Sequence, residues 1–243
     1  MHRFLCCSCF SNGNERQPLL QPRVDMNGAR SARQTPSAHK AQVVRRINNL
    51  VMRQVCVPEL DKSFSDMAVT FNEQQECYEA MARHISHLQQ TYGCAHDDTL
   101  TFAECVKKIR EEYEATYRVS LRMNGYDFSL NVVPLQLDGK SEGDPLPPRL
   151  QSAQDELRII SDRAKATISK GAPLSELTGW LLRERDQMAK QVKGAAASYQ
   201  EQGRLNDNLE ANMREVRRVK ALSGGYRKRA EEVLTEAAQI AGT

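Results

Sequence analysis

The sequence predicts an all-α protein, a helical bundle or coiled coil preceded by a disordered amino-terminal arm. Apolar residues recur at steps of three and four over long stretches of the 243-residue chain, as on one face of a helix. Gly and Pro, which interrupt helices, account for only 13 and 9 residues. The mean hydropathy is −0.61. Because no apolar run approaches the roughly 18 residues that cross a bilayer, we expect no transmembrane helix.

Residues 1–40 are expected to form the disordered arm. Their Pro, Gly, Ser, Asn and Gln content leaves too little apolar surface after residue 10 to offset the entropy of ordering. Residues 1–46 carry eight Lys and Arg against two acidic residues, a net charge of +6, whereas the rest of the chain sums to −3. This asymmetry is typical of contact with an anionic surface, either a membrane or nucleic acid.

Residues 41–125 are expected to form a helical bundle or coiled-coil segment. A first helix from Ala41 would end at Pro58, because proline breaks a helix. The next helix, over 59–92, has a heptad repeat with these core positions: Leu60, Phe64, Met67, Phe71, Gln74, Tyr78, Met81, Ile85, Leu88 and Tyr92. After Gly93, Thr101 and Glu104 form a capping-box pattern that begins a third helix. Its apolar face predicts an end near residues 124–125.

Residues 126–148 are expected to be a Pro/Gly-rich linker. They contain four Pro and two Gly, and their one strand-like alternation has no visible partner. Residues 149–243 predict long C-terminal helices. Pro173 would open the longest of these, with weak points at Gly194, Gly203 and the pair at 224–225.

Three cysteines at the amino terminus, Cys6, Cys7 and Cys9, lie among bulky apolar residues. This cluster indicates S-acylation (palmitoylation), which would make the chain a lipoprotein at the cytosolic face of a membrane. His2 stands where N-myristoylation requires glycine, so we do not expect that modification. The alternatives are incidental cysteines on a tail, or ligands for a metal. Seven cysteines at irregular spacings do not resemble the disulfide framework of a secreted domain.

An acidic dileucine motif follows, formed by Glu15, Leu19 and Leu20 in the pattern E-x-x-x-L-L. Such an extended segment is suited to sorting proteins of the clathrin-adaptor type. Together with the cysteines, residues 1–20 resemble the tails of acylated late-endosomal and lysosomal scaffolds, of the type that anchors the Ragulator complex. The resemblance implies lipid anchoring and a role in endosomal or lysosomal protein transport. The chain departs from those tails at His2, where they carry an acceptor glycine, and the alternative is a chance Leu pair in a linker.

A basic cluster occupies the last predicted helix. Between residues 214 and 229 the net charge is +6, from one Glu and these seven residues: Arg214, Arg217, Arg218, Lys220, Arg227, Lys228 and Arg229. Such a run is consistent with a solvated helix face, or with contact to phospholipid headgroups, an acidic protein or nucleic acid. No nucleic-acid motif accompanies it, so we do not expect a nucleic-acid partner.

The sequence suggests no metal, cofactor, small-molecule substrate or catalytic site. A zinc site is conceivable at Cys77, His84, His87, Cys94 and His96, but no C-x-x-C pair accompanies these residues. Walker, dinucleotide-binding, G-x-S-x-G, H-E-x-x-H and kinase motifs are all missing from the sequence.

We therefore expect a non-enzymatic adaptor or scaffold. Its acylated arm would attach it to the cytosolic face of endosomal, lysosomal or Golgi-derived membranes, where its bundle would recruit coiled-coil or other helical proteins. The first alternative is a coiled-coil structural subunit of a cytoskeletal or tethering complex without lipid anchoring. The second is a nucleic-acid-associated helical protein that uses its basic segments.

Overall fold

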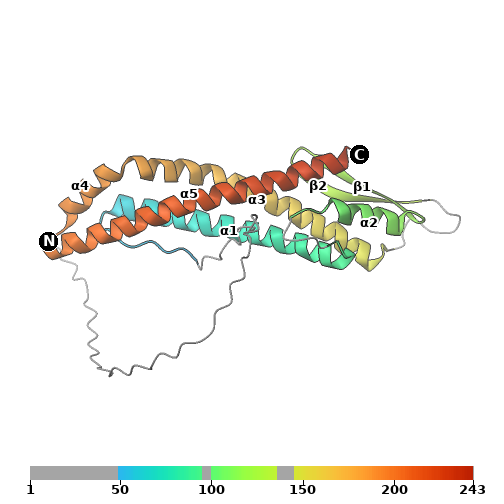
Figure 1. Cartoon of the computed structure of the whole chain (residues 1–243), viewed down its shortest axis with the longest axis horizontal. Coiled ribbons are helices and arrows are strands. Elements are labelled where there is room, and N and C mark those ends of the chain that lie inside the picture. The colour runs from blue at the N-terminus through green and yellow to red at the C-terminus, as the bar shows by residue number, and fades with distance from the viewer. Residues whose placement is uncertain (1–48, 95–99, 136–144, 243) are drawn as a thin grey trace, which may run out of the picture. The chain divides into compact units, whose positions relative to one another are not determined.

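The computed structural model describes residues 49–94, 100–135 and 145–242 (Figure 1). Within them lie α1 (Pro58–Tyr92), α2 (Ala103–Tyr113), β1 (Tyr117–Asn124), β2 (Asp127–Pro134), α3 (Pro148–Arg183), α4 (Arg185–Ala195) and α5 (Tyr199–Ala241). Helices dominate, and the two strands form a single small sheet. The predicted all-α class is confirmed, with this hairpin as an addition. The predicted arm, residues 1–40, lies outside the described residues.

The three long helices α1, α3 and α5 pack along one another (Figure 1). They bury two apolar clusters. The hairpin core joins the carboxyl half of α1 to α2, the hairpin, the first half of α3 and the end of α5. The second cluster, which we call the strap core after the segment that precedes α1, joins residues 50–57 to the first half of α1, the end of α3, α4 and the first half of α5. The described residues belong to one compact unit, so the described parts of the predicted segments 41–125 and 149–243 pack together.

Helix α1 follows the heptad prediction closely. Pro58 occupies its first turn, where the missing N–H has no helical partner to lose. Every predicted core position is buried except Tyr78, which is half-buried. Gly93 ends the helix with a φ of 61°, in the left-handed region that glycine tolerates best.

A polar layer separates the two cores. The fully buried Gln74 donates a hydrogen bond from Nε2 to the carbonyl oxygen of Thr167 on α3, at 3.0 Å. Nearby, the rings of Tyr78 and Tyr226 stack with centroids 4.4 Å apart. The single polar position of the heptad seam thus directs its Nε2 atom at the backbone of α3, while its buried Oε1 atom has no hydrogen-bond partner in the described part of the chain.

The segment before α1 is extended, so the predicted helix from Ala41 is wrong over residues 49–57. Leu50 and Val55 are buried, whereas Val51 is 81% exposed. We call residues 49–57 the strap. It is extended because side chains of α1 and α5, rather than a preceding helical turn, bond its backbone groups.

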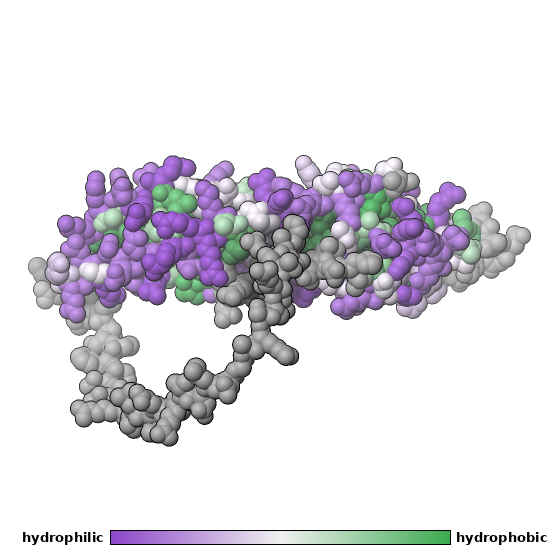
Figure 2. Space-filling view, viewed as in Figure 1, coloured by the Kyte–Doolittle hydropathy of each residue, from purple (hydrophilic) through white to green (hydrophobic). Residues whose placement is uncertain are grey.

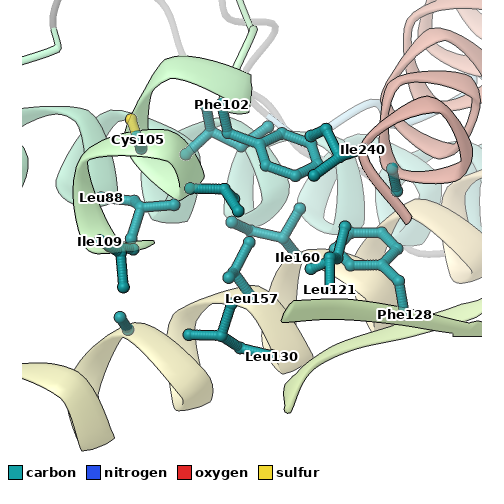
Figure 3. Close-up of a cluster of buried hydrophobic side chains, with 14 of the residues drawn as sticks. Leu88, Phe102, Cys105, Ile109, Leu121, Phe128, Leu130, Leu157, Ile160 and Ile240 are labelled. Carbon is teal, nitrogen blue, oxygen red and sulfur yellow. The ribbon is translucent and has the colours of Figure 1, made fainter. Parts of the chain in front are cut away.

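The third predicted helix and the predicted linker are both corrected by the hairpin. Helix α2 ends at Tyr113, and β1 pairs antiparallel with β2, with Leu121 opposite Leu130. Gly125, with a φ of 62°, opens a two-residue turn of the kind that joins twisted strands. The linker prediction for 126–148 is therefore wrong over 127–134. Figure 3 shows Leu121, Phe128 and Leu130 pointing into the hairpin core toward Leu157 and Ile160 of α3.

The C-terminal helices divide at other points than predicted. Pro173 lies inside α3 instead of opening a new helix, and the breaks fall at Glu184 and at 196–198. Pro173 is exposed, while Leu174 beside it is buried, so packing maintains a helix that proline alone would disfavour. Gly203 and the glycines at 224–225 lie within the uninterrupted α5, whose first residue, Tyr199, is 91% exposed.

Candidate functional site

The predicted functional residues divide into two groups. The acylation candidates Cys6, Cys7 and Cys9 and the sorting motif of Glu15, Leu19 and Leu20 lie outside the described residues. The predicted basic cluster is described, and all of it lies on α5.

The seven basic side chains are all exposed, and we call them the basic face. They project outward because the intervening positions turn inward: Met213, Val216, Val219 and Tyr226 are buried in the strap core. The helix therefore presents these charges on a preformed surface, where each cation near an anionic membrane contributes about 1 kcal/mol to binding.

The charge of the basic face is concentrated at its amino-terminal half. Arg227, Lys228 and Arg229 lie 2.8 to 4.0 Å from carboxylates of Glu231 and Glu232. Glu231 and Glu232 lie just beyond residues 214–229, for which the sequence predicts a net charge of +6. The net charge around Arg227, Lys228 and Arg229 is therefore lower than predicted.

In the other half, Arg218 pairs with the carboxylate of Glu215 at 3.7 Å. Arg214, Arg217 and Lys220 form no ion pair with any acidic group in the described part of the chain. Exposed ion pairs contribute only about 0–1 kcal/mol, but they do lower the local potential. A negatively charged surface would therefore meet the strongest attraction between residues 214 and 220.

Beside this half of α5, the strap is held by asparagine side chains, an arrangement that sequence reasoning missed. Asn72 of α1 accepts a hydrogen bond from the Leu50 N–H at 2.8 Å and donates one to the Leu50 carbonyl at 3.0 Å. Asn212 of α5 does the same for Arg53, at 2.9 and 2.7 Å. Each amide thus pairs with the backbone as a neighbouring β-strand would.

Two further side chains complete what we call the strap site, formed by Asp61, Asn72, Asn208 and Asn212. Asn208 donates to the Gln54 carbonyl at 2.8 Å, and Asp61 accepts from the Val55 N–H at 2.7 Å. Leu50 and Val55 enter the strap core. All six hydrogen bonds go to main-chain groups. The site therefore recognises an extended backbone and two apolar side chains five positions apart.

The residues of the possible zinc site do not converge. His84 and His87 bond through Nδ1 to the two carboxylate oxygens of Glu156, at 2.7 and 2.9 Å, while His96 lies outside the described residues. Cys94 bonds the Tyr92 carbonyl oxygen instead. Over residues 49–94, 100–135 and 145–242, no group of three or more His, Cys, Asp or Glu could hold a metal ion.

The buried cysteines are shielded from solvent. Burial raises the pKa of Cys105 to about 12, with a smaller contribution from its hydrogen bond to Cys94. The Cys105 thiol therefore stays protonated at neutral pH and is a poor nucleophile.

A groove of about 840 Å³ lies between the hairpin turn, α3 and α5. Apolar residues such as Met123, Ile168 and Leu234 line it, and Lys165 and Arg227 lie among them. Both cations already have carboxylate partners: Lys165 pairs with Asp127 and Asp162, and Arg227 pairs with Glu231.

Figure 2 shows that hydrophilic residues predominate on the visible face, with hydrophobic residues in small separate patches. Of the helices that the structure describes, none combines the length and the apolar character needed to span a membrane. Comparison of the chain with protein-family models, curated proteins and solved structures gives no match.

Proposed function

We propose that the protein is a non-enzymatic adaptor, attached to the cytosolic face of endosomal, lysosomal or Golgi-derived membranes. The observation that carries the proposal is the basic face of α5, where Arg214, Arg217 and Lys220 are exposed and form no ion pair with a described acidic group. Three such cations on one preformed surface suit an anionic leaflet better than a neutral one.

Lipid attachment would come from the arm. Cys6, Cys7 and Cys9 offer up to three thioester sites, and stable anchoring requires at least two membrane signals, because one acyl chain binds only marginally. The basic face would supply an additional electrostatic signal. Its strength depends on ionic strength, since salt screens exposed charges over about 8–10 Å.

Recruitment of partners would be the task of the helical unit and the arm together. The long helices α1, α3 and α5 offer exposed faces to coiled-coil or other helical proteins. The motif of Glu15, Leu19 and Leu20 would engage sorting proteins of the clathrin-adaptor type in an extended conformation.

Membrane fractionation of cells that express the full chain tests this function. Hydroxylamine, which cleaves thioesters, and the triple substitution Cys6→Ser, Cys7→Ser and Cys9→Ser should each move the protein into the soluble fraction. Cys56→Ser is the matched control, because Cys56 is an exposed thiol of the strap, outside the arm. Unchanged membrane association of the triple variant would refute the lipid-anchored adaptor.

A further inference from the structure

The turn between the strap and α1 is short and strained. Val55 bonds to Asp61 in the first turns of α1, and Leu50 bonds to Asn72 further along it, so the strap runs back along the helix that follows it. Only Cys56 and Val57 separate Val55 from Pro58. Cys56 has a φ of 59°, and it is the only residue other than glycine with a positive φ among those the structure describes. An L-residue in this left-handed region is strained.

An empty strap site would be unfavourable. Departure of the strap would remove both hydrogen bonds between Asn212 and Arg53 and would expose the apolar surface on which Leu50 and Val55 pack. The site does not distinguish one copy of the strap from another, because it reads main-chain groups and the side chains of Leu50 and Val55.

We infer that the protein forms a dimer by exchange of straps, in which the strap of each chain occupies the strap site of a second copy. Opening the turn at Cys56 directs the strap away from its own α1 and toward another chain. The exchanged strap makes the same six hydrogen bonds and buries the same two apolar side chains. Two strained turns are relaxed in each dimer, and short strained hinges favour such exchange. The dimer depends on neither acylation nor the basic face.

Substitutions at Cys56 test the exchange, because they change the turn and leave the strap site intact. Gly adopts the left-handed region freely and should favour the closed monomer, whereas Val tolerates it poorly and should favour the dimer. Cys56→Ser retains an L-residue without a thiol. It should therefore behave as the wild type and exclude a disulfide as the link.

The measurement is the monomer–dimer dissociation constant of the full chain without acylation, in reducing buffer, by light scattering after size exclusion and by native mass spectrometry of mixed isotope-labelled copies. We expect the dissociation constant of Cys56→Gly to exceed that of Cys56→Ser by at least about tenfold, as two relaxed hinges imply. Cys56→Val should lower the dissociation constant below that of Cys56→Ser. If Val impairs folding by circular dichroism, the comparison of Gly with Ser suffices. Absence of a dimer from the wild type and the Ser and Val variants would overturn the inference, as would a dimer insensitive to residue 56.

Discussion

Glu236, near the end of α5, caps the start of α2 by accepting a hydrogen bond from the backbone N–H of Phe102 at 3.0 Å. The same carboxylate oxygen accepts from the Ala103 N–H at 2.9 Å. Phe102, rather than the predicted Thr101, is the N-cap residue, and its own side chain has no capping group. The start of α2 therefore depends on a residue 134 positions later in the chain.

Glu236→Ala should lower the free energy of unfolding by about 1 kcal/mol, the usual effect of removing a helix cap. Urea denaturation followed by circular dichroism measures the change. Gln239→Ala, an exposed position one turn further along α5, is the control and should have a smaller effect. Equal losses in the two variants would contradict a capping role.

The same carboxyl group should make stability depend on pH. Burial raises the pKa of Glu236 above its ordinary value of 4.5, against the opposing effect of the two backbone hydrogen bonds. A carboxyl whose pKa is raised on folding contributes most to stability below its unfolded pKa, and that contribution declines as pH rises through the folded pKa. The advantage of the wild type over Glu236→Gln in urea titrations should therefore fall as the pH rises above 4.5. A stability advantage of the wild type that grows as the pH rises would contradict a raised pKa of Glu236.

Phe71→Ala should destabilise the protein by about 3–5 kcal/mol, because the Phe71 ring is 0% exposed in the strap core. Glu76→Ala, on the exposed face of the same helix, should change the melting temperature far less. Thermal denaturation of the two variants under identical conditions makes the comparison. Similar small losses would mean that α1 is not packed through its heptad seam.

Gly171 and Gln74 should be energetically coupled. A Cβ atom on Gly171 would lie 3.0 Å from Nε2 of Gln74, whose side chain is held by its bond to Thr167. Gly171→Ala should therefore forfeit the roughly 1 kcal/mol of stability that Ala normally gains over Gly within a helix. Gly203→Ala, with open space around it, should show that gain. In a Gln74→Ala background, Gly171→Ala should become stabilising, and a double-mutant cycle measures the coupling.

Charge reversal should reveal which half of the basic face binds anionic lipid. Changing Arg214, Arg217 and Lys220 together to Glu should weaken binding to phosphatidylserine vesicles in a sedimentation assay. The matched triple change at Arg227, Lys228 and Arg229 should weaken it less, because Glu231 and Glu232 already offset those charges. The loss of vesicle binding in each triple variant, relative to the wild type, should become smaller in high salt. Equal effects of the two triple variants would show that the local ion pairs do not matter.

The sequence predicts an element well when its buried residues recur at regular steps along a single helix. The seam from Leu60 to Tyr92 is such a case, since its period identifies the buried side without knowledge of what covers it. The hairpin was missed because Tyr117 and Leu121 are four residues apart, a spacing that suits a helix face as well as alternate positions of a strand. Asn124 and Gly125 likewise suit both a helix end and a hairpin turn.

The strap site was beyond local reasoning for a different physical reason. Its asparagines are ordinary polar residues of α1 and α5 in the sequence, and nothing near them indicates a bound backbone. The basic face was predicted because its seven residues lie within 16 positions of one helix, residues 214–229. Its partial neutralisation was also visible in the sequence, two residues beyond Arg229.

The bond between Arg53 and Asn212 also constrains the order of events during synthesis, because 159 positions separate the two residues. At about 5–20 residues per second, a ribosome needs roughly 10–30 s to travel from one codon to the other. Throughout that interval the newly made strap has no complete site on its own chain, because Asn212 has not yet been synthesised. An unpaired strap can instead enter the site of a neighbouring chain that has just been completed on the same messenger, so the proposed exchange would occur most readily during translation.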